Sequence, residues 1–370
     1  MAGSTFGTIF RIMTWGESHG KGVGVTIDGC PAGLPLCEED VQEYLDRRRP
    51  GQSRYATARK EGDQVEILSG IFEGKTTGTP IAMTVRNQDQ RSQDYGEIMN
   101  VYRPGHADYC FEQKYGFRDY RGGGRSSARE TIARVAAGAV ACKLLAQYGI
   151  KVTAYVKSIG EFEVDPKRFD LAERDNNSLN MPDAVAASET EEFLERMMKA
   201  QDSVGGVVEC IVEGVPAGIG EPVFDKLDSC LARAVMSIGA VKGFEIGDGF
   251  AAARALGSQN NDAFSAGEDG TIKKETNHSG GILGGMSDGS DIVLRAAFKP
   301  TPSIAQPQHT ANNAGENVEI AIKGRHDPVV VPRAVVVVEA MTALTVADLL
   351  LEDRCARIQE EIRHEDCNGK

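Results

Sequence analysis

The clearest periodic pattern in the chain is helical and follows residue 130. Apolar residues recur there at helical spacing, for example at Ile132, Val135 and Leu145, and Gly149 is a typical stop signal. Many of the positions between them are alanine, which permits close packing on more than one side. The pattern predicts a helix that is sandwiched between layers rather than one that lies on a surface.

Shorter patterns surround this helix. Alternating apolar and polar residues predict strands at 24–28, 64–72, 81–86, 152–159 and 206–213. Helical spacing with matching end signals predicts helices at 38–49 and 188–201, and a last long helix after Pro332. Two polar stretches predict irregular structure, an exposed connection at 174–182 and a mobile loop or lid at 257–281.

Three short segments occur twice and in the same order: Asp28–Leu34 and Glu213–Ile219, Ile67–Gly74 and Ile282–Gly289, Gly124-Arg125 and Gly324-Arg325. Their shared order indicates a duplicated unit, with halves at about 1–180 and 181–351 followed by a charged tail at 352–370. If each half contributes one antiparallel sheet and buried helices, the layers stack as sheet, helices, sheet. We therefore expect a single α+β domain over 1–370, a β-α-β sandwich with helices between two antiparallel sheets related by a pseudo-twofold axis.

Composition narrows the class of protein. The net charge of −13 disfavours general binding to nucleic acids or membranes, which requires a positive field. The eight cysteines are scattered and form no C-x-x-C pair or metal-ligand spacing, so we expect reduced thiols, no metal and a cytoplasmic location. We also expect a soluble protein, since we find no run that is long and apolar enough to span a bilayer and no signal peptide.

Against this acidic background, the segment Arg121–Glu130 concentrates positive charge. Three glycines allow close approach of the backbone to a ligand, and Ser127 with Glu130 forms a capping box at the start of the long helix. Helix N-termini bind anions, but they contribute only about 0.3–2 kcal/mol, so specific binding needs the neighbouring Arg125, Arg129 and Arg134. A glycine-rich turn with a good cap is the simpler alternative, and the arginines favour a ligand.

Other candidate groups also lie in turns that glycine or proline interrupts. Ser18 and His19 lie in Gly16–Gly20, and His106 lies in Arg103–Asp108. A basic stretch at 47–60 indicates either a well-capped helix with a solvated face or an inward-facing arginine. Histidines beside arginines predict an enzyme that acts on a small polyanion by proton transfer.

Two common enzyme classes do not fit these motifs. Adjacent Ser18 and His19 make a poor hydrolase pair, because neighbouring side chains rarely form the required hydrogen bond and no G-x-S-x-G elbow is present. The sequence also contains no G-x-x-x-x-G-K-[ST] phosphate-binding loop, which disfavours a P-loop nucleotidase.

Six motifs taken together resemble the chorismate synthase family, over about residues 6–351: Gly16–Gly20, Asp46–Gly51, Arg103–Asp108, Tyr120–Thr131, Val241–Gly249 and Gly324–Pro328. This resemblance implies a lyase of the shikimate pathway. Its members convert 5-enolpyruvylshikimate 3-phosphate to chorismate and phosphate by a 1,4-anti elimination. They require reduced FMN, adopt a β-α-β sandwich and are typically homotetramers.

The resemblance also implies roles for individual residues. His19 would be the acid that assists phosphate departure, His106 would protonate or hold the reduced flavin, and Asp327 would act with it in removing the C6 proton. The residues implied for substrate binding are Ser18, Arg48, Arg54, Arg103 and Arg134. Those implied for flavin binding are Arg125, Ser126, Ser127, Gly239, Ala240, Gly284, Lys299, Pro300, Thr301, Pro302, Ser303 and Arg325.

Two details of the resemblance stay open. Some descriptions of the family assign Arg48 and Arg54 to NADP, and many relatives carry asparagine where this chain has Gly239. NADPH would serve only indirectly as a reductant, and a separate flavin reductase would supply the reduced FMN. The alternatives are a flavin oxidoreductase that uses the same pocket and a module that binds RNA or a phosphorylated partner, which the acidic charge disfavours.

Overall fold

The computed structural model describes residues 3–51, 54–55, 62–87, 98–268, 270–322 and 327–356. In this part of the chain, helices and antiparallel strands combine into an α+β fold, as predicted. The first sheet has the order β1-β2-β3-β7-β4. Its strands are β1 (Thr5–Phe6), β2 (Arg11–Gly16), β3 (Gly22–Asp28), β7 (Ile81–Arg86) and β4 (Val65–Ser69).

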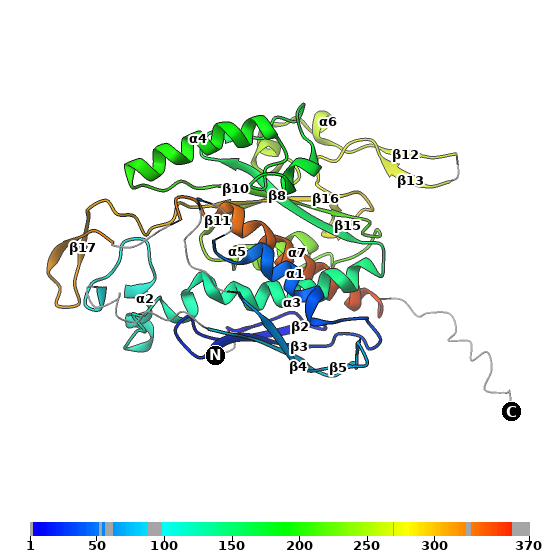
Figure 1. The fold of residues 1–370 in the computed structure, drawn as a ribbon. Helices are drawn as coiled ribbons and strands as arrows, with labels where there is room; N and C mark the ends of the chain where they lie inside the picture. The colour runs from blue at the N-terminus through cyan, green and yellow to red at the C-terminus, as the bar shows by residue number, and fades with distance from the viewer. Residues whose placement is uncertain are drawn as a thin grey trace.

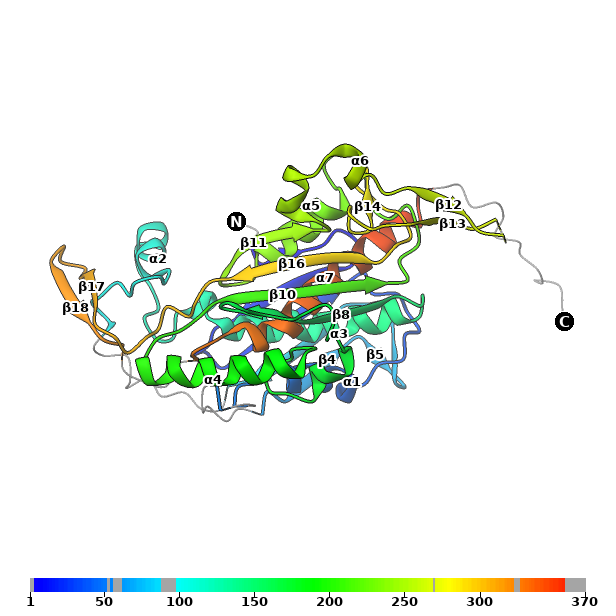
Figure 2. The same ribbon diagram turned by 90° about the horizontal axis from the view of Figure 1, so that it is seen from above.

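The second sheet has the order β11-β16-β10-β8-β9 and is also antiparallel. Figure 2 looks onto it and shows its main strands side by side. Its strands are β11 (Val241–Ile246), β16 (Ile292–Phe298), β10 (Gly206–Glu213), β8 (Lys151–Ile159) and β9 (Phe162–Glu163). Small hairpins are β5 (Ile71–Phe72) with β6 (Lys75–Thr76), β12 (Phe264–Ala266) with β13 (Ile272–Lys274), β14 (Ile282–Leu283) with β15 (Met286–Ser287), and β17 (Gln308–Ala311) with β18 (Asn317–Ile320).

The helices form a layer of their own. Figure 1 shows α1, α3, α5 and α7 between the two sheets and α4 on the other side of the second sheet. The bounds are α1 (Glu38–Arg48), α2 (Asp108–Tyr115), α3 (Thr131–Ala146), α4 (Ala184–Ala200), α5 (Leu227–Met236), α6 (Gly257–Asn260) and α7 (Val331–Asp353). Helix α4 begins four residues earlier than predicted, because Asp183 caps it by accepting from Val185 N and Ala186 N.

Helix α7 corrects an expectation about membranes. By length and composition it could cross a bilayer, with a mean hydropathy of 2.0, so the chain does contain such a run. In the structure, 94% of this window is buried inside the protein. Helix α7 is apolar on all sides because other elements cover it on all sides. A helix apolar on all sides is either a membrane span or the buried core helix of a protein, and α7 is the second kind.

The two long helices cross at Gly138 of α3 and Ala340 of α7. A Cβ added to Gly138 would lie 2.3 Å from the Cβ of Ala340 and 2.6 Å from its Cα. These atoms belong to or adjoin backbone and cannot rotate aside, so glycine sets the distance between the helices. Figure 1 shows both helices beginning on the side of the molecule where α2 and β17 lie.

The two sheets are built in the same order. Strands β2-β3-β7-β4 of the first match β8-β10-β16-β11 of the second, and each set ends in a long central helix. Because β8 begins at Lys151 and lies in the second sheet, the chain passes from the first sheet to the second near residue 150.

The small hairpins carry the same hydrogen bonds. Thr76 Oγ1 donates to Pro31 O and accepts from Leu34 N, at 2.6 and 3.0 Å. Ser287 Oγ makes the equivalent bonds to Pro216 O and Ile219 N, at 2.5 and 2.9 Å. These contacts align Gly70–Gly78 with Gly281–Gly289. The sequence match paired Ile67–Gly74 with Ile282–Gly289, so the two alignments differ by a shift of four residues.

The stretch 257–281 is ordered by a buried lysine rather than being irregular. The ammonium of Lys274, whose side chain is 1% exposed, lies 3.1 Å from Asp262 and 2.7 Å from Asp288. It also donates to Asn277 and Ser279. This cluster fixes the base of the β12–β13 hairpin, which Figure 2 shows projecting from one end of the second sheet.

We expect Gly138→Ala to destabilise the fold. Overpacking costs about 1–3 kcal/mol of stability, and the cost should lie near the upper value here because the added Cβ meets atoms at and beside the backbone of Ala340. This cost exceeds the gain of about 1 kcal/mol that alanine brings to a helix relative to glycine. The measurement is the free energy of unfolding in urea. Gly257→Ala is the matched control, since a Cβ there meets nothing within 4 Å; equal effects of the two changes would contradict this account of the crossing.

Candidate functional site

The turn between β2 and β3 carries Ser18 and His19. Asn87 holds this turn, since its Nδ2 donates to the carbonyl oxygens of Glu17 and Gly20, both at 2.9 Å. Ser18 Oγ lies 3.1 Å from Nδ1 of His19. The expectation that these adjacent side chains would not form a hydrogen bond is therefore wrong.

The glycine loop predicted to bind an anion packs directly on His19. A Cβ added to Gly122 would lie 2.4 Å from Cε1 of His19, and the φ of +66° at Gly122 also favours glycine. Ser18 Oγ donates to Gly122 O at 3.4 Å. The next glycine, Gly123, lies near Arg103, since a Cβ added to it would lie 3.9 Å from Nη2 of Arg103. The loop thus brings His19 and Arg103 to one place.

His106 lies in a loop that is fixed from both sides of its ring. Nδ1 lies 3.0 Å from Pro104 O, and Nε2 lies 3.0 Å from Ser303 Oγ. Because a carbonyl oxygen only accepts, Nδ1 carries the proton and Nε2 of the neutral ring accepts from the hydroxyl. Burial lowers the pKa of His106 below its usual range, and the nearby charge of Arg103 acts in the same direction.

The segment 299–303, which follows β16, closes over this loop. Lys299 Nζ donates to Gly105 O at 2.8 Å, and Lys299 N donates to Ala240 O at 3.0 Å. A Cβ added to Gly105 would lie 2.7 Å from Cβ of Pro302. In the described part of the chain, Thr301 Oγ1 is buried and has no hydrogen-bond partner. The structure therefore brings this predicted flavin-binding segment against the His106 loop.

Arg103 is held by a carboxylate that the sequence did not single out. Asp108 accepts from Arg103 Nε and Nη2, both at 2.8 Å, and from the Arg103 backbone N at 3.1 Å. Arg118 Nη1 also lies 3.1 Å from Asp108. Burial works against the ionised form of Asp108, but the bonds and charges of Arg103 and Arg118 lower the pKa of this carboxyl overall. Arg118 also pairs with Glu112 at 3.5 Å, so Asp108 is the carboxylate that fixes the orientation of Arg103.

The consecutive arginines at the end of α1 point in different directions. Arg47 binds Glu339 through both Nη atoms, at 2.8 and 2.9 Å, and Arg49 lies 3.4 Å from the exposed Asp46. Arg48 points inward and is 4% exposed, so the interpretation of the whole stretch as a solvated face is wrong for Arg48.

Arg48 belongs to a buried network at the start of α3. Its Nη1 donates to Asp63 at 3.2 Å, and its Nη2 donates to Ala128 O at 2.7 Å. Arg129 Nη1 donates to the other oxygen of Asp63 at 3.1 Å. Burial lowers the pKa of Arg48 to about 10, and the charge of Arg333 contributes next. The positive charges around Arg48 therefore exceed the single negative charge of Asp63.

Arg125 and Arg134 meet at Glu130, one on each side. Arg125 Nη2 donates to Thr14 Oγ1 at 2.7 Å, and its Nη1 donates to Gly16 O at 3.1 Å. Arg134 Nε donates to Glu130 at 2.7 Å, and its Nη1 donates to Ser237 Oγ at 2.6 Å. These contacts tie Arg125 to β2 and place Arg134 at the end of α5, two residues before Gly239.

The two serines of the loop serve the backbone in this structure. Ser126 Oγ donates to Gly123 O at 2.7 Å, and Ser127 Oγ accepts from Arg129 N at 3.4 Å. The predicted capping box of Ser127 with Glu130 is not formed, because the Glu130 carboxylate accepts from Thr14 Oγ1 and Arg134 Nε instead. Short 3-10 helices, Gly124–Ser126 and Ala128–Glu130, come first, and α3 begins at Thr131.

Asp327 lies just before α7 and binds Arg333 in the first turn of that helix. Arg333 Nη1 donates to Asp327 Oδ2 at 2.7 Å. The backbone beside Asp327 is also fixed, since Val204 N donates to Pro328 O at 2.9 Å. Arg325 falls outside the described residues, so of the predicted residues in this motif only Asp327 is placed.

The structure does not bring every predicted residue to this region. Ala240 and Gly239 follow the C-terminal end of α5, whereas Gly284 lies in the hairpin at its other end, where Leu227 N donates to Gly285 O. A helix of ten residues is about 15 Å long. Within one chain, Gly284 therefore lies away from the other predicted flavin residues. Sequence spacing did not reveal at which end of α5 this hairpin would lie.

Arg54 also lies apart from the others. It is 62% exposed and bridges to Glu191 and Glu195 of α4, at 3.7 and 2.9 Å. A ligand would have to compete with two carboxylates for this guanidinium.

Sequence reasoning missed the residues that hold the predicted ones. Asp63, Asp108, Asn87 and Arg333 are each bonded to a predicted group or to its loop. Only Asp108 carried a usable signal, because it ends the same motif as Arg103 and His106. Asp63 and Asn87 lie far along the chain from their partners, whereas Arg333 lies only six residues after Asp327.

These contacts define the candidate site as a surface formed by the loops 16–20, 103–108, 121–127 and 299–303 with the starts of α3 and α7. Arginines and two helix N-termini give it positive character, which suits an anion. His19 and His106 supply groups that transfer protons near neutral pH.

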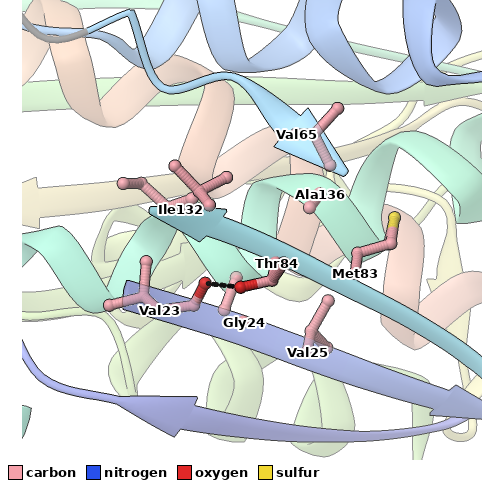
Figure 3. Close-up of a pocket in the computed structure, with 10 residues that line it drawn as sticks. Val23, Gly24, Val25, Val65, Met83, Thr84, Ile132 and Ala136 are labelled. Carbon is pink, nitrogen blue, oxygen red and sulfur yellow. Dashed lines mark hydrogen bonds between the residues drawn. The ribbon is translucent and has the colours of Figure 1, made fainter. Parts of the chain in front are cut away.

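An apolar pocket elsewhere does not suit such a ligand. Figure 3 shows it between β3, β4, β7 and α3, lined by residues such as Val23, Met83 and Ile132. It has no charged group, and the side-chain hydrogen bond in it runs from Thr84 Oγ1 to Val23 O at 3.5 Å. This pocket is part of the core.

Comparison with known proteins assigns a family to this arrangement. Residues 10–351 match the family described as Chorismate synthase. The chain is 65% identical to the chorismate synthase of Lachnospira eligens over 358 residues, which cover 97% of this chain and 98% of that protein. It is 56% identical to the Chloroflexus aurantiacus chorismate synthase over 366 residues, 99% of this chain and 100% of that protein.

A solved structure agrees with the sequences. A crystal structure of a chorismate synthase superposes with a TM-score of 0.75 at 36% identity, covering 94% of this chain and 93% of that one. The chain therefore belongs to the chorismate synthase family, and it is an enzyme of the chorismate-forming step of the shikimate pathway.

Proposed function

We propose that the chain converts 5-enolpyruvylshikimate 3-phosphate to chorismate and phosphate by a 1,4-anti elimination that uses reduced FMN. The observation that carries this proposal is the junction of three loops, in which Gly122 packs on His19, Gly123 lies near Arg103, and Arg103 and His106 share one turn. Groups for proton transfer and for anion binding thereby lie on one continuous surface.

The substrate carries one phosphate and two carboxylates, and the site offers arginines to match them. Arg103 and Arg134 each keep one carboxylate partner, while Arg48 and Arg129 share Asp63. Guanidinium groups bind phosphate and carboxylate in a bidentate manner. Because these arginines are already held by buried partners, binding requires little reorganisation.

Two histidines and one carboxylate divide the proton transfers. His19 donates a proton to the departing phosphate, and Asp327 takes part in removing the proton at C6. His106 stays neutral through burial, with its Nε2 facing Ser303. Positioned acids and bases contribute roughly 10²–10⁴-fold each.

The segment 299–303 suits an oxygen-rich cofactor. Thr301 has a buried hydroxyl without a partner in the described residues, and Lys299 is a nearby cation. A Cβ at Gly239 would meet nothing within 4 Å, so that position is open. We propose that 299–303, Gly239, Ala240 and the loop 125–127 hold FMN. When bound, reduced FMN supplies electron density that eases loss of the allylic phosphate.

Several further proposals rest on family resemblance. We expect a cytoplasmic homotetramer, with reduced FMN delivered by an external flavin reductase and NADPH acting only through that enzyme. The matching strand orders and hairpin bonds of the two halves support an ancestral duplication with a pseudo-twofold axis.

The test of this function is anaerobic turnover. Protein with photoreduced FMN should form chorismate, followed by its absorbance, and release phosphate without stoichiometric consumption of NADPH. A flavin oxidoreductase would instead consume one reductant for each product, and that result would overturn the proposal.

We expect Asp327→Asn and His106→Ala to retain binding of FMN and substrate but to lose turnover by about 10²–10⁴-fold each. Single-turnover rates and separate titrations of both ligands measure this. Asp165→Asn and His309→Ala are the matched controls, since Asp165 pairs with Arg168 beyond the site and the His309 side chain is 93% exposed. Near-normal turnover rates in both site variants would contradict the roles proposed for His106 and Asp327.

We also expect His106 to make stability depend on pH. Its lowered pKa means that the unfolded chain binds a proton more readily than the folded one. The stability that the neutral His106 ring contributes is fully present above the pKa of histidine in the unfolded chain, about 6.5. It is lost as the pH falls towards the lower pKa of His106 in the folded protein. The melting temperature of the wild type should therefore fall more steeply between about pH 7.5 and 5.5 than that of His106→Asn. His309→Asn is the control, and parallel curves for wild type and His106→Asn would contradict the expectation.

A further inference from the structure

Among the described residues, Arg333 forms an ion pair with a proposed catalytic group, the Asp327 carboxylate. It lies in the first turn of α7, six residues after Asp327, and donates to its Oδ2 at 2.7 Å. The two side chains are only 20% and 12% exposed, so water competes weakly for this ion pair.

The backbone beside Asp327 is anchored independently of this bond. Val204, beyond the end of α4, forms a parallel bridge with Val329 and donates to Pro328 O. These contacts fix the chain but not the rotation of the Asp327 side chain. Its orientation therefore depends on what the carboxylate binds, and Arg333 binds it from a rigid helix.

Arg333 also faces the arginine network rather than the bulk protein. After burial, the charge of Arg333 contributes most to lowering the pKa of Arg48. In the described part of the chain, Nε of Arg333 is buried and has no hydrogen-bond partner. A guanidinium that is crowded by a like charge and incompletely bonded costs stability, which is expected of a functional position.

We propose that Arg333 is a positioning residue for Asp327, which it holds in the orientation needed for proton removal. The proposal rests on the function proposed above for Asp327. Arg333 acts through that carboxylate and does not itself contact the reacting atoms.

A double-mutant cycle tests this. In the full-length protein with reduced FMN and 5-enolpyruvylshikimate 3-phosphate, Arg333→Met should lower kcat by about 10²-fold, as expected when a catalytic group is misplaced, with KM nearly unchanged. Arg333→Lys should recover part of the rate, since an ammonium can still pair with the carboxylate. Arg333→Met added to Asp327→Asn should cost nothing further, because residues that act as one unit are not additive.

Other outcomes decide against the proposal. Multiplying losses in the double variant, or a normal kcat in Arg333→Met, would overturn it. Arg168→Met is the control for general damage, because Arg168 makes an ion pair of 2.9 Å with the buried Asp183 outside the site; it should keep normal kcat.

A readout that does not use activity separates this proposal from the proposed function. A crystal structure of Arg333→Met should show the Asp327 carboxylate rotated from its present position, and an unchanged carboxylate would overturn the inference. If the wild type forms no chorismate, the proposed function fails, whatever that structure shows. Should Arg333→Met not fold, Arg333→Lys gives the same comparison with partial effects.

Discussion

The close contact of α3 with α7 is the constraint on which the rest of the structure depends. Two helices of this length can share one layer between two sheets only if their backbones approach closely, and Gly138 permits this at Ala340. The crossing brings the first turns of both helices to one side of the molecule (Figure 1). The site is formed where these turns meet the loops that leave the strands, so core packing determines where chemistry can occur.

The second general feature is that carboxylates hold the arginines of the site. Asp63, Asp108 and Glu130 are at most partly exposed, and each contacts two guanidinium groups. At Asp63 and Glu130, one shared carboxylate fixes two guanidinium groups and leaves excess positive charge, whereas Arg118 beside Asp108 also pairs with Glu112. This arrangement explains how a chain of net charge −13 can present a local surface that suits an anion.

The sequence predicted elements and motifs better than contacts. Helix α1, helix α3 and strands β3, β4, β7, β8 and β10 follow from periodicity, since burial of one face imposes it, whereas β2 and β11 were not predicted. The loops of His19 and His106 were found because glycine and proline interrupt them. The positions of Gly284 and Arg54 were not predictable, because motif spacing does not tell at which end of a helix a hairpin lies or which acids on α4 approach a loop. Asp63 was missed because its partners Arg48 and Arg129 come from separate elements, and only the fold brings them together.

One tie between the chain's two ends has a consequence for synthesis. Asp348, near the end of α7, accepts the backbone N–H groups of Thr8, Ile9 and Phe10 at 2.7–2.8 Å, a separation of 338–340 residues along the chain. The segment leading into β2 therefore waits for residue 348 to leave the ribosome. Because α7 packs against β8 and β10, the second sheet cannot cover its inner face before α7 has been synthesised. Such non-local closure predicts slow folding and a nascent chain that exposes apolar surface until α7 is made.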